Sequence, residues 1–207
     1  MKETLNQIAE KIRKNFEACD KGRERAFFLH REIIKRSSQA IRAVHRGEYP
    51  EGQKLVDEAK SLLLEATRSV AQFPRVAFAG FLEDAQKEYV EAWLTLTVIA
   101  YQTVPDPDEV GVEYSAFLNG LAETVGELRR HILDLIRQGQ AEMGEQFLQY
   151  MDEIFYVLTG LDFPDMITNG LRRRTDIARS IIEKTRGDLT ACLSQNQLLK
   201  EMKKIGG

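Results

Sequence analysis

The sequence has only two cysteines, Cys19 and Cys192, and they lie near opposite ends of the 207-residue chain. Neither belongs to a CxxC pair, so the sequence offers no sign of a disulfide framework or a thiolate zinc site. Free thiols persist in reducing compartments, so we expect a cytoplasmic protein in which both cysteines serve only packing.

Long apolar runs are also lacking. The longest charge-free apolar stretch, Ala92–Pro105, is too short to span a bilayer and ends in turn residues. The first residues, MKETLNQIAEKIRK, do not contain the apolar segment of a signal peptide. We therefore expect no membrane association.

Neither sign of charge dominates, since the chain has 29 basic and 32 acidic residues and a net charge of -3. This balance argues against a protein that attracts nucleic acid over its whole surface. A nucleic-acid partner would need a local basic surface.

Prolines are few, and no segment alternates apolar and polar residues over a sustained stretch, which disfavours strands. Between the five prolines the apolar spacing is helical. We expect helices over about 3–46, with a bend near Gly22, and over about 51–72, 75–102, 112–138, 140–160 and 171–200, with a short turn at 163–168. The sequence therefore predicts an all-α fold, a single-domain antiparallel bundle of about six to seven helices over residues 1–207.

Two of these helices carry unusual acidic residues. After Tyr89 the segment 75–102 is apolar on nearly every face, and Glu91 is the only charge in that half. Glu88 lies one turn earlier on the same face, and Asp84 continues the stripe. A buried carboxylate is costly, so we expect Glu91 to have a cationic partner or to be protonated.

The segment 112–138 repeats the pattern, because Glu123 and Glu127 repel at i, i+4 spacing among apolar neighbours. Gly120 and Gly126 beside them would allow a close helix approach or leave room for a substrate. If the two helices are neighbours, four carboxylates converge, and such oxygen ligands suit Mg²⁺ or Mn²⁺. The alternative interpretation is a solvated acidic face.

At these residues the sequence resembles the translin/Trax family. QKEYVEA (Gln86 to Ala92) resembles QEYVEA of Trax, and AETVGELRR (Ala122 to Arg130) resembles ADLTGELMR. LHREIIKRSSQAIRAVHR (Leu29 to Arg46) is similar to LSRDITVESKRTIFLLHR, and QFLQYMDEIFYVLTG resembles QFLRQVYDGFSFIG. The resemblance spans about residues 20–190 and is closest to Trax, the catalytic subunit, because translin lacks the QEYVEA glutamates.

The resemblance implies a translin-like fold and a Mg²⁺-dependent ribonuclease that cleaves single-stranded RNA inside a closed octameric shell. The family's catalytic carboxylates correspond to Glu88, Glu91, Glu123 and Glu127, with Glu123 standing where Trax has an aspartate. The basic N-terminal extension of animal Trax is missing and the loop between the third and fourth helices is shorter. We therefore expect a compact homo-octamer, with a hetero-oligomer containing a translin-like subunit as the alternative.

Basic residues provide candidates for RNA binding through phosphate contacts. They lie along the first helix, after the fourth-helix carboxylates and at the start of the last helix: Arg23, Arg25, Arg31, Lys35, Arg42, Arg46, Arg130, Arg172, Arg173 and Arg174. The alternative for each is a solvated surface charge. Positive charge at a helix N-terminus opposes the helix dipole, so the triplet 172–174 points more strongly to a ligand or partner.

Of the three histidines, His30, His45 and His131, only His131 has a metal-ligand partner by spacing, since it lies four residues after Glu127. We expect structural roles for all three. A ferritin-like di-iron bundle requires Glu-x-x-His pairs, and the sequence contains none. Two functions therefore remain, a metal-dependent endoribonuclease and a non-catalytic translin-like shell that binds single-stranded RNA or DNA.

Overall fold

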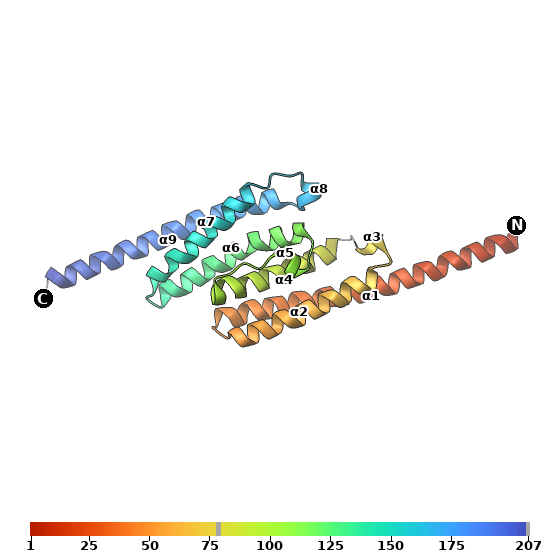
Figure 1. Cartoon of the computed structure of the whole chain (residues 1–207), viewed down its shortest axis with the longest axis horizontal. Coiled ribbons are helices and arrows are strands. Elements are labelled where there is room, and N and C mark those ends of the chain that lie inside the picture. Colours follow the sequence, from red (N-terminus) through yellow and green to blue (C-terminus); the bar gives the residue numbers. More distant parts are fainter. Residues whose placement is uncertain (78–79, 206–207) are drawn as a thin grey trace.

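The computed structural model describes residues 1–77 and 80–205, and over these ranges the chain is helical and contains no strand. The elements follow one another in the order drawn in Figure 1: α1 (Lys2–His45), α2 (Tyr49–Val70), α3 (Pro74–Ala77), α4 (Gly80–Leu96), the π-helix η1 (Thr97–Tyr101), α5 (Pro107–Val110), α6 (Tyr114–Arg137), α7 (Ala141–Thr159), α8 (Asp165–Thr168) and α9 (Leu171–Ile205). No helix in these ranges has the length and apolar character needed to cross a bilayer.

The all-helical prediction is confirmed, with two local differences. The segment expected as one helix over 75–102 contains α3, α4 and the wider turn of η1, which ends where Gln102 adopts a left-handed conformation with φ of 56°; residues 78 and 79 lie outside the described ranges. The expected bend near Gly22 is absent, because α1 is continuous. Gly22 instead lies against the end of α2, where a Cβ would come within 2.6 Å of the Ser69 carbonyl oxygen.

The long helices pack side by side, and α4 occupies the middle of the bundle. It contacts α1 and α2 on one side and α6 on the other, while α7 and α9 cover the far side of α6 (Figure 1). Tyr89, Val90, Leu94 and Leu96 of α4 are fully buried, as expected for a helix that is apolar on nearly every face. Of the acidic residues of α4, Glu83, Glu88 and Glu91 are partly buried and Asp84 is exposed.

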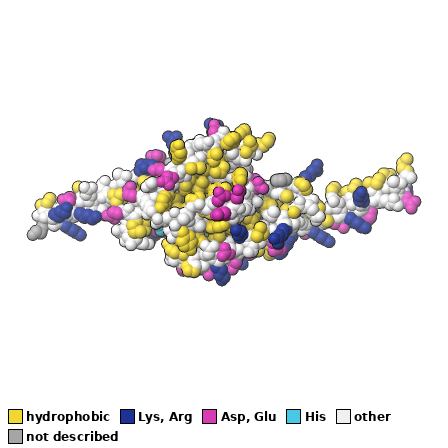
Figure 2. Space-filling view, in the orientation of Figure 1, with side chains coloured by type: hydrophobic (Ala, Val, Ile, Leu, Met, Phe, Trp, Pro, Cys, Tyr) yellow, Lys and Arg dark blue, Asp and Glu magenta, His cyan; other side chains and the backbone are white. Residues whose placement is uncertain are grey.

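Both terminal helices project from the bundle at opposite ends (Figure 1). Along α1 the first buried residue is Ala26, and residues 1–18 are all exposed. Leu5, Ile8, Ile12 and Phe16 follow one another at spacings of three or four residues and are all exposed. Figure 2 shows these apolar side chains along the projecting end, where they form one stripe on the helix.

Candidate metal centre

Three carboxylates from two helices converge between α4 and α6. Glu88, Glu91 and Glu123 each offer an oxygen atom, and these atoms lie within 4.8 Å of one another. We call these three residues the carboxylate cluster. Glu88 and Glu91 share a face of α4 because they are three residues apart. The cluster combines three of the four carboxylates that the sequence analysis selected.

Gly120 allows α6 to approach α4 closely beside the cluster. A Cβ at position 120 would lie 2.6 Å from Cγ1 of Val90 and 2.9 Å from the carbonyl oxygen of Lys87. Glu123 follows Gly120 by one turn and so extends over the same part of α4. The expectation of close helix approach is therefore met at Gly120, whereas a Cβ at Gly126 would meet no atom within 4 Å.

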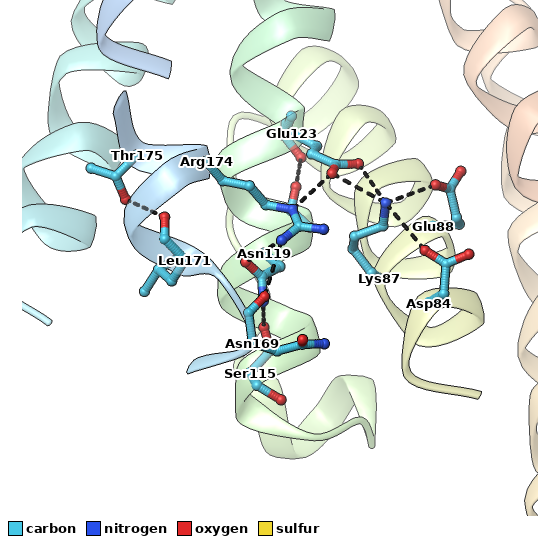
Figure 3. Close-up of polar contacts among 12 residues, drawn as sticks. Asp84, Lys87, Glu88, Ser115, Asn119, Glu123, Asn169, Leu171, Arg174 and Thr175 are labelled. Carbon is cyan, nitrogen blue, oxygen red and sulfur yellow. Dashed lines mark hydrogen bonds and ion pairs between the residues drawn. The ribbon is translucent and has the colours of Figure 1, made fainter. Parts of the chain in front are cut away.

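Lys87 lies among the acidic side chains and is buried (Figure 3). Its Nζ lies 3.0 Å from Oε1 of Glu88, 3.1 and 3.0 Å from Oε1 and Oε2 of Glu123, and 3.5 Å from Oδ1 of Asp84. Burial alone lowers the pKa of Lys87, but its hydrogen bonds to Glu123 and Glu88 outweigh burial and hold that pKa above its ordinary value. The ammonium group therefore stays charged at the centre of the site.

Arg174 reaches Glu123 from the first turn of α9. Its Nε donates to Oε1 of Glu123 at 3.0 Å, and its Nη1 donates to the Asn169 carbonyl oxygen at 3.1 Å and to Oδ1 of Asn119 at 3.3 Å. Asn119 is buried, and its Nδ2 donates to the carbonyl oxygens of Ser115 and Thr168. These bonds, drawn in Figure 3, connect α6, α8 and α9 and fix the guanidinium beside Glu123.

Glu91 is the most strongly perturbed acid of the site. Burial is the main cause that raises its pKa to about 8, and the neighbouring charges of Glu123, Glu88 and Glu127 add to the increase while Lys87 opposes it. Lys87 lies one turn before Glu91 but contacts the other two carboxylates instead. Of the two expectations for Glu91, a cationic partner or protonation, the pKa favours protonation at neutral pH.

Glu127 lies one turn beyond Glu123 and has a different partner. Its Oε2 lies 2.5 Å from Nε2 of His45 on α1 and 3.9 Å from Nη1 of Arg130. Glu127 is close enough to raise the pKa of Glu91, but it does not belong to the group of oxygens within 4.8 Å. Glu127 is thus a neighbour of the carboxylate cluster that is paired with α1.

The carboxylate cluster has the chemistry of a divalent cation site. Oxygen ligands at this density suit Mg²⁺ and Mn²⁺. Glu91, which has no ion pair in the described part of the chain, would become an ionised ligand if a cation offset the repulsion from its neighbours. Glu88, Glu91 and Glu123 therefore fit the ligand set of such an ion.

Three of the other basic candidates form ion pairs away from the cluster. Arg23 pairs with Asp20, Arg25 with Glu65 and Arg46 with Glu48. The guanidinium of Arg31 lies over the ring of Phe27, and that of Arg42 donates to Ser38. Three further candidates are exposed and form no ion pair with another described residue: Lys35, Arg172 and Arg173. Two basic candidates contact the carboxylates selected from the sequence. Arg130 lies beside Glu127, and Arg174 pairs with Glu123.

Three residues of the site were not selected from the sequence for it: Lys87, Asn119 and His45. Lys87 had a detectable signal, because it precedes Glu91 by four residues and so shares its helix face. Asn119 likewise precedes Glu123 by four residues. His45 had no local signal, since its contact with Glu127 joins residues 82 positions apart.

Comparisons with known proteins place this site in context, although no protein-family model matches the chain. The chain is 30% identical over 188 residues to the uncharacterised protein MJ0175 of Methanocaldococcus jannaschii. The aligned region covers 90% of this chain and 83% of that protein. Two similar solved structures are AfC3PO and its complex with duplex RNA, each with a TM-score of 0.83, 32% identity, and coverage of 90% of this chain and 97% of theirs.

A third structure, apo-NeC3PO, has a TM-score of 0.76 at 22% identity and covers 91% of this chain and 96% of its own, so it supports the fold alone. The similarity to AfC3PO covers 90% of this chain and 97% of the other protein. On this likeness in sequence and structure, the chain belongs to the translin/Trax family of C3PO proteins.

Proposed function

We propose that this chain is a Trax-like, metal-dependent endoribonuclease that cleaves single-stranded RNA inside a closed oligomeric shell. The observation that carries the proposal is the convergence of Glu88, Glu91 and Glu123 within 4.8 Å. An acidic surface patch would not require a partly buried glutamate with a strongly raised pKa at its centre, whereas ligands of a cation are arranged in this way.

The four selected carboxylates would have different roles. Glu88, Glu91 and Glu123 would hold Mg²⁺ or Mn²⁺, and Glu127 would act beside them as a further ligand or as the group that orients the attacking water. The ion, when bound, would supply a hydroxide-forming water and offset charge on the phosphodiester oxygens. Arg174 holds Oε1 of Glu123, and Nζ of Lys87 lies 3.0 Å from Oε2 of the same carboxylate.

RNA is the proposed substrate because AfC3PO, a family member that is 32% identical to this chain, was solved with duplex RNA. Phosphate contacts would come from basic residues near the cluster, above all Arg172 and Arg173, which are exposed in the same turn as Arg174. The alternative function is a non-catalytic shell that binds single-stranded RNA or DNA, and it predicts binding without metal-dependent cleavage.

The decisive experiment compares cleavage of labelled single-stranded RNA by the wild type and by Glu91→Gln, with Mg²⁺ and with EDTA. Glu145→Gln, an exposed glutamate on α7, is the matched control. We expect wild type and control to cleave only with Mg²⁺, and Glu91→Gln to lose at least about a hundredfold in rate. RNA binding without cleavage by the wild type would favour the non-catalytic shell, and equal cleavage by all three proteins would reject this site.

The shell is proposed as a homo-octamer, with a hetero-oligomer that includes a translin-like subunit as the alternative. The projecting end of α1 supports assembly, since Phe16 is 67% exposed and Leu5 57% in an apolar stripe that a lone chain leaves in water. Light scattering coupled to size exclusion measures the mass of the purified chain. A monomer at micromolar concentration would contradict the shell.

A further inference from the structure

We propose that Lys87 is an internal cation that occupies the carboxylate cluster in the metal-free protein and has to leave Glu88 and Glu123 before a divalent ion binds there. This inference rests on the proposed function, because it concerns the same metal site. In addition, the Lys87 ammonium group would compete with the divalent ion for the same carboxylates and so lower the affinity of the site for metal.

The contacts of Lys87 resemble those of a bound cation. An ammonium group has three N–H donors, and Nζ lies within 3.1 Å of one oxygen of Glu88 and both oxygens of Glu123. Two of the three residues of the cluster therefore already share a positive charge (Figure 3). Glu91, the third, has no such contact in the described part of the chain.

A divalent ion and the Lys87 ammonium cannot both keep these partners. Mg²⁺ binds carboxylate oxygens at about 2.0–2.1 Å, so an ion on Glu88 and Glu123 would lie within a few ångströms of Nζ. Two cations at that separation in a partly buried site repel strongly. Metal binding therefore requires Nζ to move.

Lys87 is the cation that can move, and Arg174 is the one that cannot. Arg174 is fixed by Asn119 and the carbonyl oxygen of Asn169, and it uses only one oxygen of Glu123. The lysine side chain is a flexible four-carbon stem, and Asp84, one turn back along α4, already lies 3.5 Å from Nζ. Lys87 can retreat toward Asp84 and solvent while Arg174 stays in place.

The first test measures Mn²⁺ binding by the full-length chain from the free Mn²⁺ signal in electron paramagnetic resonance. Lys87→Met keeps the length of the side chain and removes its charge. We expect its dissociation constant for Mn²⁺ to be at least about tenfold lower than that of the wild type, because no cation has to be displaced. Lys54→Met, an exposed lysine on α2, is the charge-matched control and should change affinity by less than about twofold.

The Mn²⁺ titrations distinguish a failure of the Lys87 inference from a failure of the metal site itself. If the wild type binds Mn²⁺, Glu91→Gln weakens that binding, and Lys87→Met binds no tighter than the wild type, the metal site stands and the competing role of Lys87 is overturned. If neither the wild type nor Lys87→Met binds Mn²⁺, the metal centre itself fails, and the inference fails with it.

A second measurement uses only the wild type, in case Lys87→Met does not fold. Acylation of lysine side chains is followed by mass spectrometry with saturating Mg²⁺ and at equal ionic strength without it. We expect Mg²⁺ to raise the rate at Lys87 at least about threefold relative to Lys54, because displacement moves the amine out of its contacts with Glu88 and Glu123 and exposes it. An unchanged ratio of the two rates would overturn the inference.

Discussion

Nε of Arg174 donates to Oε1 of Glu123 at 3.0 Å, and this bond joins the first turn of α9 to the middle of α6. The same guanidinium donates to Asn119 and to the carbonyl oxygen of Asn169, the residue that ends α8 with a positive φ of 49°. A single side chain thus connects three helices and orients a carboxylate of the cluster. This arrangement explains why a basic residue occupies the start of α9 against the helix dipole.

Replacing Arg174 by lysine should destabilise the protein even though the charge is kept. An ammonium group cannot reproduce the planar arrangement of donors that reaches Glu123, Asn119 and Asn169 together. We expect the free energy of unfolding to fall by about 1–3 kcal/mol, since the buried Asn119 and the partly buried Glu123 lose a hydrogen-bond donor. Urea unfolding in EDTA measures it. Arg173→Lys, an exposed neighbour, should stay within about 0.5 kcal/mol of the wild type, and equal losses in both variants would contradict the assigned role.

Gly120→Ala should separate α4 from α6. The added methyl group would meet Val90 and the Lys87 carbonyl at distances below 3.0 Å, and the backbone would have to shift. We expect a loss of about 1–3 kcal/mol in unfolding free energy and weaker Mn²⁺ binding, because Glu123 moves away from Glu88 and Glu91. Thermal unfolding and metal titration measure the two effects.

Gly126→Ala is the matched control on the same helix. A methyl group there meets no atom within 4 Å, and alanine favours a helix, so we expect a gain of up to about 1 kcal/mol. Similar losses in both glycine variants would argue against close packing as the reason for Gly120.

The raised pKa of Glu91 predicts a stability that falls with pH in metal-free protein. In the unfolded chain the carboxyl ionises near its ordinary pKa of 4.5, whereas in the folded chain it holds its proton until about pH 8. The folded state therefore binds more protons between these values, so the stability contribution is fully present below pH 4.5 and is lost as pH rises through 8.

Glu91→Gln removes this dependence while keeping the shape of the side chain. With EDTA present, we expect its unfolding free energy relative to the wild type to increase from about pH 5 to about pH 8 by roughly 1–3 kcal/mol. Denaturant unfolding across this pH range measures the difference. A constant difference throughout would mean that Glu91 is already ionised in the folded metal-free protein.

The helical fold was largely predictable because each long helix has its own apolar periodicity. The prolines also marked real boundaries, as at Pro50 in the first turn of α2 and Pro74 at the start of α3, whereas the short helix α5 at Pro107 was not predicted. The end of α4 was not predictable, since the uniformly apolar residues 92–101 give no signal for a change from α- to π-helical hydrogen bonding. Gly22 was misinterpreted because a close contact with a distant helix resembles a break in local sequence.

The carboxylate cluster was partly predictable for the same reason. Glu91 stands out as a lone charge in an apolar segment, and Glu88 follows from helical spacing. The pairing of Glu127 with His45 and the bonds around Arg174 depend on how α1, α8 and α9 pack against α6. No local pattern carries that information.

The basic surface at the start of α9 provides a test of RNA binding that is independent of cleavage. Arg172 and Arg173 are exposed one or two residues before Arg174, so reversing both charges should weaken binding while leaving the cluster intact. We expect a lower affinity of Arg172→Glu/Arg173→Glu for single-stranded RNA. Its dependence on log salt concentration should become shallower by about 1.4, which corresponds to two lost phosphate contacts at roughly 0.7 each.

Lys203→Glu/Lys204→Glu is the control for charge alone, because it makes the same change on the same helix at its projecting far end (Figure 1). Fluorescence anisotropy in EDTA, repeated across a range of NaCl concentrations, gives affinity and salt dependence together. If RNA is held beside the carboxylate cluster, only the first double variant loses affinity and salt dependence. Equal losses in both would mean that RNA responds to net charge, and Arg172 and Arg173 would then have no specific role.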